Sequence, residues 1–128
     1  MRKFLYFGTS TAPIGQTTED GLDCLLVDAS KLRSIEPGSI PTETMIYFSR
    51  NSFSPTVDRI QVFHDDNTAT HHRCKDISRA LGEIIAANPH EEFIDVIDFY
   101  NDKTHPALKS FVTSIYIDSA YLPRFPLE

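Results

Sequence analysis

The richest concentration of side chains able to do chemistry lies between His64 and His72. It offers three imidazoles and two carboxylates within nine residues: His64, Asp65, Asp66, His71 and His72. Transition metals accept such ligands, so one hypothesis is a metal-dependent enzyme that uses the His64–His72 turn. However, His71 and His72 are adjacent and would point roughly 100° apart on a helix, so they cannot easily share one metal.

The same stretch has a simpler reading. An Asp-Asp-Asn run is typical of a turn, and carboxylates are favoured just before a helix N-terminus. We therefore predict a solvated turn at His64–His72. The sequence predicts no metal ligand, no catalytic residue and no cofactor.

Other chemical patterns are weaker. Asp95 and Asp98 resemble paired acids, but their odd spacing would put them on opposite faces of a strand. Cys24 and Cys74 are predicted to be buried thiols rather than a disulfide or a nucleophile. His105 precedes a proline in a polar loop, where we expect it to be exposed. The glycine-rich stretch after Phe7 lacks the Gly-Lys-Ser/Thr of a phosphate-binding loop.

Composition places the chain among folded proteins. At 128 residues, with 41% hydrophobic residues and 14 aromatic ones (9 Phe, 5 Tyr), we expect a single domain over 1–128. The formal net charge of −6 makes nucleic acid and anionic membranes unfavourable partners. No apolar run is long enough for a transmembrane helix, and residues 1–7 turn polar too soon for a signal peptide. We expect a cytoplasmic protein, in a host cell if the source is viral, with the virion as an alternative.

One segment carries a helical pattern, over residues 70–88. Its apolar stripe predicts one face packed on a core, and Thr70 is a plausible N-cap: the stripe consists of Cys74, Ile77, Leu81, Ile84, Ile85 and Asn88. Pro89 ends the helix. Gly82 interrupts the helical pattern, and a glycine there would let the helix lie close to a sheet.

The remaining periodic segments predict strands, at 3–7, 22–28, 44–49, 58–64, 92–100 and 111–117. Residues 29–35 are predicted to form a short turn that tucks Leu32 and Ile35 inward, and 36–41 break regular structure. Residues 101–109 are predicted to be a polar connection, and 119–128 a tail that docks on its own domain or on a neighbouring subunit.

The expected order is β-β-β-β-α-β-β. Short links require the first four strands to be mainly antiparallel. The fold class is therefore mainly β (α+β): a small bent antiparallel sheet or open barrel, Sm-like, with one capping helix at about 70–88.

The pattern resembles small uncharacterised proteins from marine viruses (phages) and ocean metagenomes. The matching pieces cover nearly the whole chain: Phe4-Leu5-Tyr6-Phe7, Leu25-Leu26-Val27, Leu32-Arg33-Ser34-Ile35-Glu36-Pro37, Met45-Ile46-Tyr47-Phe48, Ile60-Gln61-Val62, the single helix, Phe93-Ile94-Asp95-Val96 and Val112-Thr113-Ser114-Ile115-Tyr116-Ile117. The resemblance implies a bent, Sm-like β-barrel without known enzymatic activity. Sm proteins begin with a helix, whereas the helix here follows the predicted fourth strand, which argues against an Sm-type ring and RNA role.

Three functional hypotheses follow. The first is a non-enzymatic structural or interaction protein, such as a viral or accessory component, that forms a homo-oligomer or binds another protein. The second is a small barrel that binds single-stranded nucleic acid by stacking bases on aromatic strands. The third is the metal-dependent enzyme at His64–His72.

Overall fold

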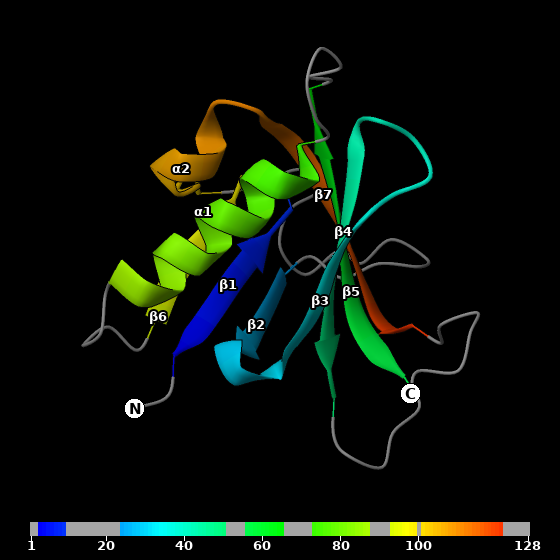
Figure 1. Ribbon diagram of the computed structural model, residues 1–128. Helices are drawn as coiled ribbons and strands as arrows, with labels where there is room; N and C mark the ends of the chain where they lie inside the picture. Colours follow the sequence, from blue (N-terminus) through cyan, green and yellow to red (C-terminus); the bar gives the residue numbers. More distant parts are fainter. Residues whose placement is uncertain are drawn as a thin grey trace.

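The structure is a computed structural model that describes residues 3–9, 24–50, 56–65, 73–87, 93–99 and 101–121. Figure 1 shows the arrangement of its strands and helices. In chain order these are β1 (Phe4–Gly8), β2 (Cys24–Asp28), the 3-10 helix η1 (Ala29–Lys31), β3 (Leu32–Pro37), β4 (Glu43–Ser49), β5 (Val57–His64), α1 (Cys74–Ala87), β6 (Phe93–Asp98), α2 (Pro106–Lys109) and β7 (Val112–Tyr121).

The strands form two sheets. Sheet A has three strands in the order β2-β1-β6, and sheet B has four in the order β3-β4-β5-β7. The pair β1–β6 is parallel and the other four neighbouring pairs are antiparallel. The predicted mainly β, α+β class is thus confirmed. The described strands do not close into a barrel.

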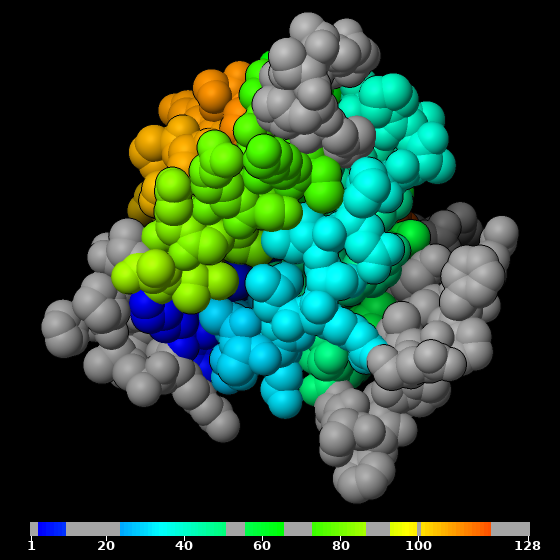
Figure 2. Space-filling model, in the orientation of Figure 1, coloured from blue at the N-terminus to red at the C-terminus, as the bar shows by residue number. Residues whose placement is uncertain are grey.

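Helix α1 lies across one face of sheet A, as Figure 1 shows. Ile77, Leu81 and Ile84 are each 1% exposed and belong to one apolar core that includes residues of both sheets. The predicted helical stripe is therefore a core face. In Figure 2 the atoms of α1 and of the η1–β3 segment fill the side of the molecule that Figure 1 presents. The ammonium group of Lys3 donates to the carbonyl of Ile85, which ties the start of β1 to the helix.

The sequence interpretation misses one strand. Residues 29–35 were expected to form a turn, but only η1 is a turn, and the chain continues into β3. Leu32 and Ile35 do pack against the core, as predicted. Pro37 argues against a strand, because proline has no amide proton to donate in the hydrogen bonds between strands. A proline is nevertheless tolerated at the end of an edge strand such as β3. The helix consequently follows the fifth strand and not the fourth.

Three smaller features also differ from expectation. The predicted polar connection 101–109 contains the short helix α2. Strand β7 continues to Tyr121, past the predicted end at Ile117 and into the predicted tail. A Cβ on Gly82 would meet no atom within 4 Å, so this glycine does not serve close packing against a sheet. Thr70, Asn88 and residues 122–128 lie outside the described residues. Among the residues that the structure describes, no helix is long and apolar enough to cross a membrane.

Candidate functional site

The face of sheet A opposite α1 carries a distinctive set of side chains. Strand pairing sets Tyr6 beside Leu26 and beside Asp95, and it sets Phe4 beside Asp28 and Phe93. Side chains of paired residues point to the same side of a sheet. We call this the outer face, and it comprises Cys24, Leu26, Asp28, Phe4, Tyr6, Gly8, Phe93, Asp95 and Asp98. The alternate residues Leu5, Phe7, Val27 and Ile94 lie in the core.

Asp95 and Asp98 lie on this same face, so the prediction that they occupy opposite faces is wrong. The cause is an irregularity in the β1–β6 pairing: Tyr6 pairs with Asp95, but Phe7 pairs with Ile97 and Gly8 with Asp98. The extra residue, Val96, is a β-bulge that shifts the alternation by one position. Val96 and Ile97 are therefore both buried, and Asp98 returns to the side of Asp95.

Asp98 organises the loop that follows β6. Its carboxylate accepts hydrogen bonds from the backbone and side-chain amides of Asn101, at 3.1 and 3.0 Å. Its carbonyl accepts from the amide of Lys103, at 2.9 Å, and its own amide donates to the hydroxyl of Thr104, at 3.2 Å. Asp102 adopts the left-handed conformation, with φ of 54°, in the tight turn. These bonds fix Asn101 and Lys103 beside the sheet.

A pocket of about 430 Å³ lies along the outer face of the two parallel strands, from the start of β6 to the loop that follows it. Its lining residues are Tyr6, Phe93, Asp95, Asp98, Asn101 and Lys103. The rings of Tyr6 and Phe93 stack with centroids 5.7 Å apart and planes at 27°. The carboxyl ends of parallel strands are common places for ligands to bind.

Gly8 lies against two of the residues that line the pocket, Asp98 and Tyr6. A Cβ at Gly8 would lie 3.0 Å from the Oδ1 atom of Asp98 and 3.4 Å from the hydroxyl oxygen of Tyr6. The phenol and the buried carboxylate therefore both approach the strand at the point where a side chain is missing. Any larger residue would push one of them away.

The pocket has a negative electrostatic character. Partial burial, the neighbouring Cys24 thiol and the charges of Asp98 and Asp95 together raise the pKa of Tyr6 to about 12. The phenol is thus neutral at physiological pH. Cys24 itself is exposed at the edge of the face, so the prediction that it is buried is wrong.

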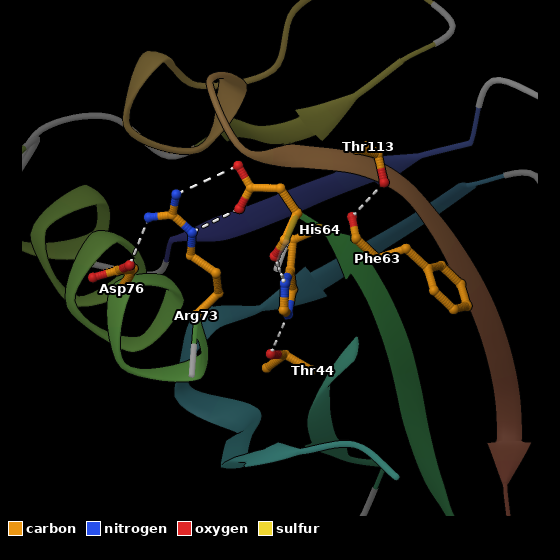
Figure 3. A network of polar contacts seen from close by, with 7 residues as sticks. Thr44, Phe63, His64, Arg73, Asp76 and Thr113 are labelled. Atoms are coloured by element: carbon orange, nitrogen blue, oxygen red, sulfur yellow. Dashed lines mark hydrogen bonds and ion pairs between the residues drawn. The ribbon is translucent and has the colours of Figure 1, made fainter. Parts of the chain in front are cut away.

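Of the His64–His72 stretch the structure describes only His64 and Asp65, and His64 differs from the prediction. His64 is 3% exposed at the end of β5 and is not part of a solvated turn. Its Nδ1 atom lies 2.8 Å from the carbonyl of Asp65, and its Nε2 atom lies 2.8 Å from the hydroxyl of Thr44. Because a carbonyl only accepts, Nδ1 carries a proton and donates to Asp65, while Nε2 shares a hydrogen bond with the hydroxyl of Thr44. Figure 3 shows the His64 ring directed toward Thr44.

Asp65 has a structural partner. Arg73 donates to its two carboxylate oxygens, at 2.8 and 3.4 Å, and to Asp76, at 2.9 Å. The guanidinium also lies 4.7 Å from the ring centroid of Phe111. The hydrogen bonds to Asp65 and Asp76 raise the pKa of Arg73 above its usual value. This network, drawn in Figure 3, joins the end of β5 to the start of α1.

Among the described residues, no three His, Cys, Asp or Glu side chains are grouped in a way that would hold a metal ion. Asp66, His71 and His72 lie outside the described residues. Of the five side chains that the metal-site hypothesis needs, His64 and Asp65 already take part in hydrogen bonds or ion pairs, and the other three are not described.

Cys74 and His105 have structural roles too. Burial raises the pKa of the Cys74 thiol, which keeps it protonated and unlike an activated nucleophile. Both cysteines are free thiols, as predicted. His105 is only partly exposed, contrary to expectation: its Nδ1 accepts from the amide of Ala107, at 3.1 Å, and so caps α2.

The sequence contained a partial signal for the pocket. Asp side chains in turns commonly accept hydrogen bonds from backbone amides that follow them, and Asp98 stands just before the polar stretch that begins at Asn101. Tyr6, Phe93 and Lys103 had no such signal, because their proximity depends on the parallel pairing of β1 with β6. Comparison of the chain with models of protein families, with curated proteins and with solved structures found no match.

Proposed function

We propose that the protein is a non-enzymatic interaction protein whose contact surface is the outer face of sheet A. One observation carries the proposal: Leu26 and Phe93 are 50% and 53% exposed on this one face, on either side of Tyr6. Singly exposed apolar residues are ordinary on protein surfaces, whereas neighbouring ones mark binding sites.

The apolar residues of the outer face are contiguous. Leu26 lies directly across the strand pair from Tyr6, and the Tyr6 ring stacks on Phe93. Phe93 in turn pairs with Phe4. A partner that covers these four side chains removes rigid aromatic surface from water at a small cost in side-chain entropy.

Charge indicates what kind of partner fits. Among the described residues, the outer face and its pocket carry the carboxylates of Asp28, Asp95 and Asp98 and the ammonium of Lys103. A second copy of the chain docked on the same face would bring like charges together, which disfavours that arrangement. The complementary occupant is a protein segment with apolar and basic side chains.

The same charges bear on the other two hypotheses. Single-stranded nucleic acid would find aromatic rings for stacking, but the three carboxylates among them repel phosphates. A metal-dependent reaction at His64 has less support, since both ring nitrogens already have hydrogen-bond partners. Self-association remains a prediction, with some other surface as its interface.

A random dodecapeptide library displayed on phage tests the proposal. Selected peptides are expected to combine Arg or Lys with aromatic or aliphatic residues. Once synthesised, they should bind the Leu26→Ser/Phe93→Ser double variant at least about tenfold more weakly than the wild type, a change of about 1.4 kcal/mol.

The matched control is Ile40→Ser. Ile40 is 48% exposed but lies between β3 and β4, away from sheet A. It should leave peptide binding unchanged. Peptides that bind the double variant as tightly as the wild type would contradict the proposal, and so would a wild-type dimer in sedimentation that the double variant alone dissociates.

A further inference from the structure

The pocket along the outer face has its own recognition chemistry. It shares Tyr6 and Phe93 with the proposed contact surface, so a partner that covers this surface also reaches the pocket. Its remaining lining residues are polar or charged. What these groups would bind is a separate question from whether the face is a contact surface.

One wall of the pocket is aromatic. The stacked rings of Tyr6 and Phe93 leave Phe93 half exposed. The faces of such rings carry partial negative charge and attract guanidinium and ammonium groups. An aromatic wall beside carboxylates is therefore favourable for a cation.

Other lining residues supply hydrogen-bond acceptors. Asp95 lines the pocket and has no hydrogen-bond or ion-pair partner among the described residues. Asp98 is 2% exposed, and its carboxylate is held by the two amides of Asn101. The side-chain nitrogen of Asn101 is thereby used, which leaves its carbonyl oxygen as a further acceptor.

The charge balance favours a positive ligand. Two carboxylates outweigh the exposed ammonium of Lys103, which makes no ion pair with either of them. The charges of Asp98 and Asp95, which add to the effect of burial and of Cys24 on the pKa of Tyr6, also favour a cation in the same space. An anionic ligand would be repelled by these carboxylates, and a neutral one could donate hydrogen bonds to Asp95 but would gain no charge attraction.

Building on the proposed function, we propose that the pocket binds the cationic end of a basic side chain that the partner presents. The cation lies against the rings of Tyr6 and Phe93 and donates hydrogen bonds to Asp95. A cavity of about 430 Å³ has ample room for a guanidinium with its methylene stem. This assigns a role to Asp95 that is distinct from the structural role of Asp98.

The experiment is a titration of the full chain with N-acetyl-arginine amide, followed through backbone amide shifts in two-dimensional NMR. N-acetyl-citrulline amide has the same shape without the charge and serves as the ligand control. The arginine compound should bind in the millimolar range and shift the amides of Tyr6, Asp95 and Lys103. The citrulline compound should bind at least about tenfold more weakly.

Three variants separate the site from general charge effects. Asp95→Asn should weaken arginine binding about tenfold, and Lys103→Gln should strengthen it. Asp28→Asn, on the same face but outside the pocket lining, changes net charge equally and should leave binding nearly unchanged. Equal binding of citrulline, or equal losses in Asp28→Asn and Asp95→Asn, would overturn the inference.

The two proposals fail in distinguishable ways. If arginine does not bind but the selected peptides still need Leu26 and Phe93, only the pocket assignment is wrong. If arginine binds as expected but no peptide depends on Leu26 and Phe93, the pocket stands and the contact surface does not.

Discussion

Asp95 and Asp98 face the same side of sheet A although an odd number of positions separates them, because the bulge at Val96 shifts the alternation of β6. Both carboxylates consequently line one pocket with Tyr6. Bulges are frequent beside functional sites, where they redirect a side chain. Here the bulge brings Asp95 and Asp98 to the same side of β6, where both line the candidate binding site.

Gly8→Ala should destabilise the protein by about 1 kcal/mol. The added methyl would lie 3.0 Å from Asp98, which Asn101 holds in place, and 3.2 Å from the Tyr6 ring. The cost of overpacking, about 1–3 kcal/mol, then exceeds the gain from replacing a strand glycine. Urea unfolding measures the change.

Gly82→Ala is the matched control and should stabilise the protein by about 1 kcal/mol. Gly82 lies inside α1 with open space around its Cα, so the methyl adds helix propensity without contact. If Gly8→Ala and Gly82→Ala changed the free energy of unfolding equally, the space between Gly8 and Asp98 would be less crowded than these distances indicate.

Thr44→Val should cost about 1–3 kcal/mol, because it removes the hydroxyl that shares a hydrogen bond with the buried Nε2 atom of His64. Thr113→Val removes an exposed hydroxyl that donates to the carbonyl of Phe63, so its cost should stay below about 0.5 kcal/mol. Thermal unfolding compares the two. Nitrogen NMR of the wild type should show a proton on Nδ1 of His64, and an Nδ1 atom without a proton would contradict the hydrogen bond to the carbonyl of Asp65.

Iodoacetamide should label Cys24 several times faster than Cys74. Cys24 is exposed, whereas burial raises the pKa of the Cys74 thiol and lowers its thiolate fraction. Mass spectrometry of the two peptides over time gives both rates. Faster labelling of Cys74 would mean that it is an activated thiol and would reopen the question of catalysis.

Tyr6 should make stability depend on pH under alkaline conditions. Its pKa is about 12 in the folded protein, against about 10 in an unfolded chain. The folded state therefore keeps the phenol proton up to a higher pH than the unfolded chain does. The stabilisation that Tyr6 contributes is fully present below about pH 10 and is lost as the pH rises from about 10 to 12. The free energy of unfolding should fall more steeply over this range in the wild type than in Tyr6→Phe. Parallel curves would contradict the raised pKa.

The core was predictable from periodicity, whereas the site was not. Apolar spacing located α1, and Ile77, Leu81 and Ile84 are buried as expected. A one-residue bulge has no local signature, so the simple alternation rule misplaced Asp98. Parallel pairing of β1 with β6 joins residues about ninety positions apart, which no spacing rule reveals. His64 was misread because its ordered partner, Thr44, comes from another strand.

Hydroxyl-radical footprinting of the full chain, with and without a synthetic peptide from the selection, tests the proposed contact surface most directly. Bound peptide should protect Leu26 and Phe93 from oxidation and leave Ile40 unprotected, since only the first two lie on the outer face of sheet A. Protection of Ile40, or of neither Leu26 nor Phe93, would show that the outer face is not where the partner binds.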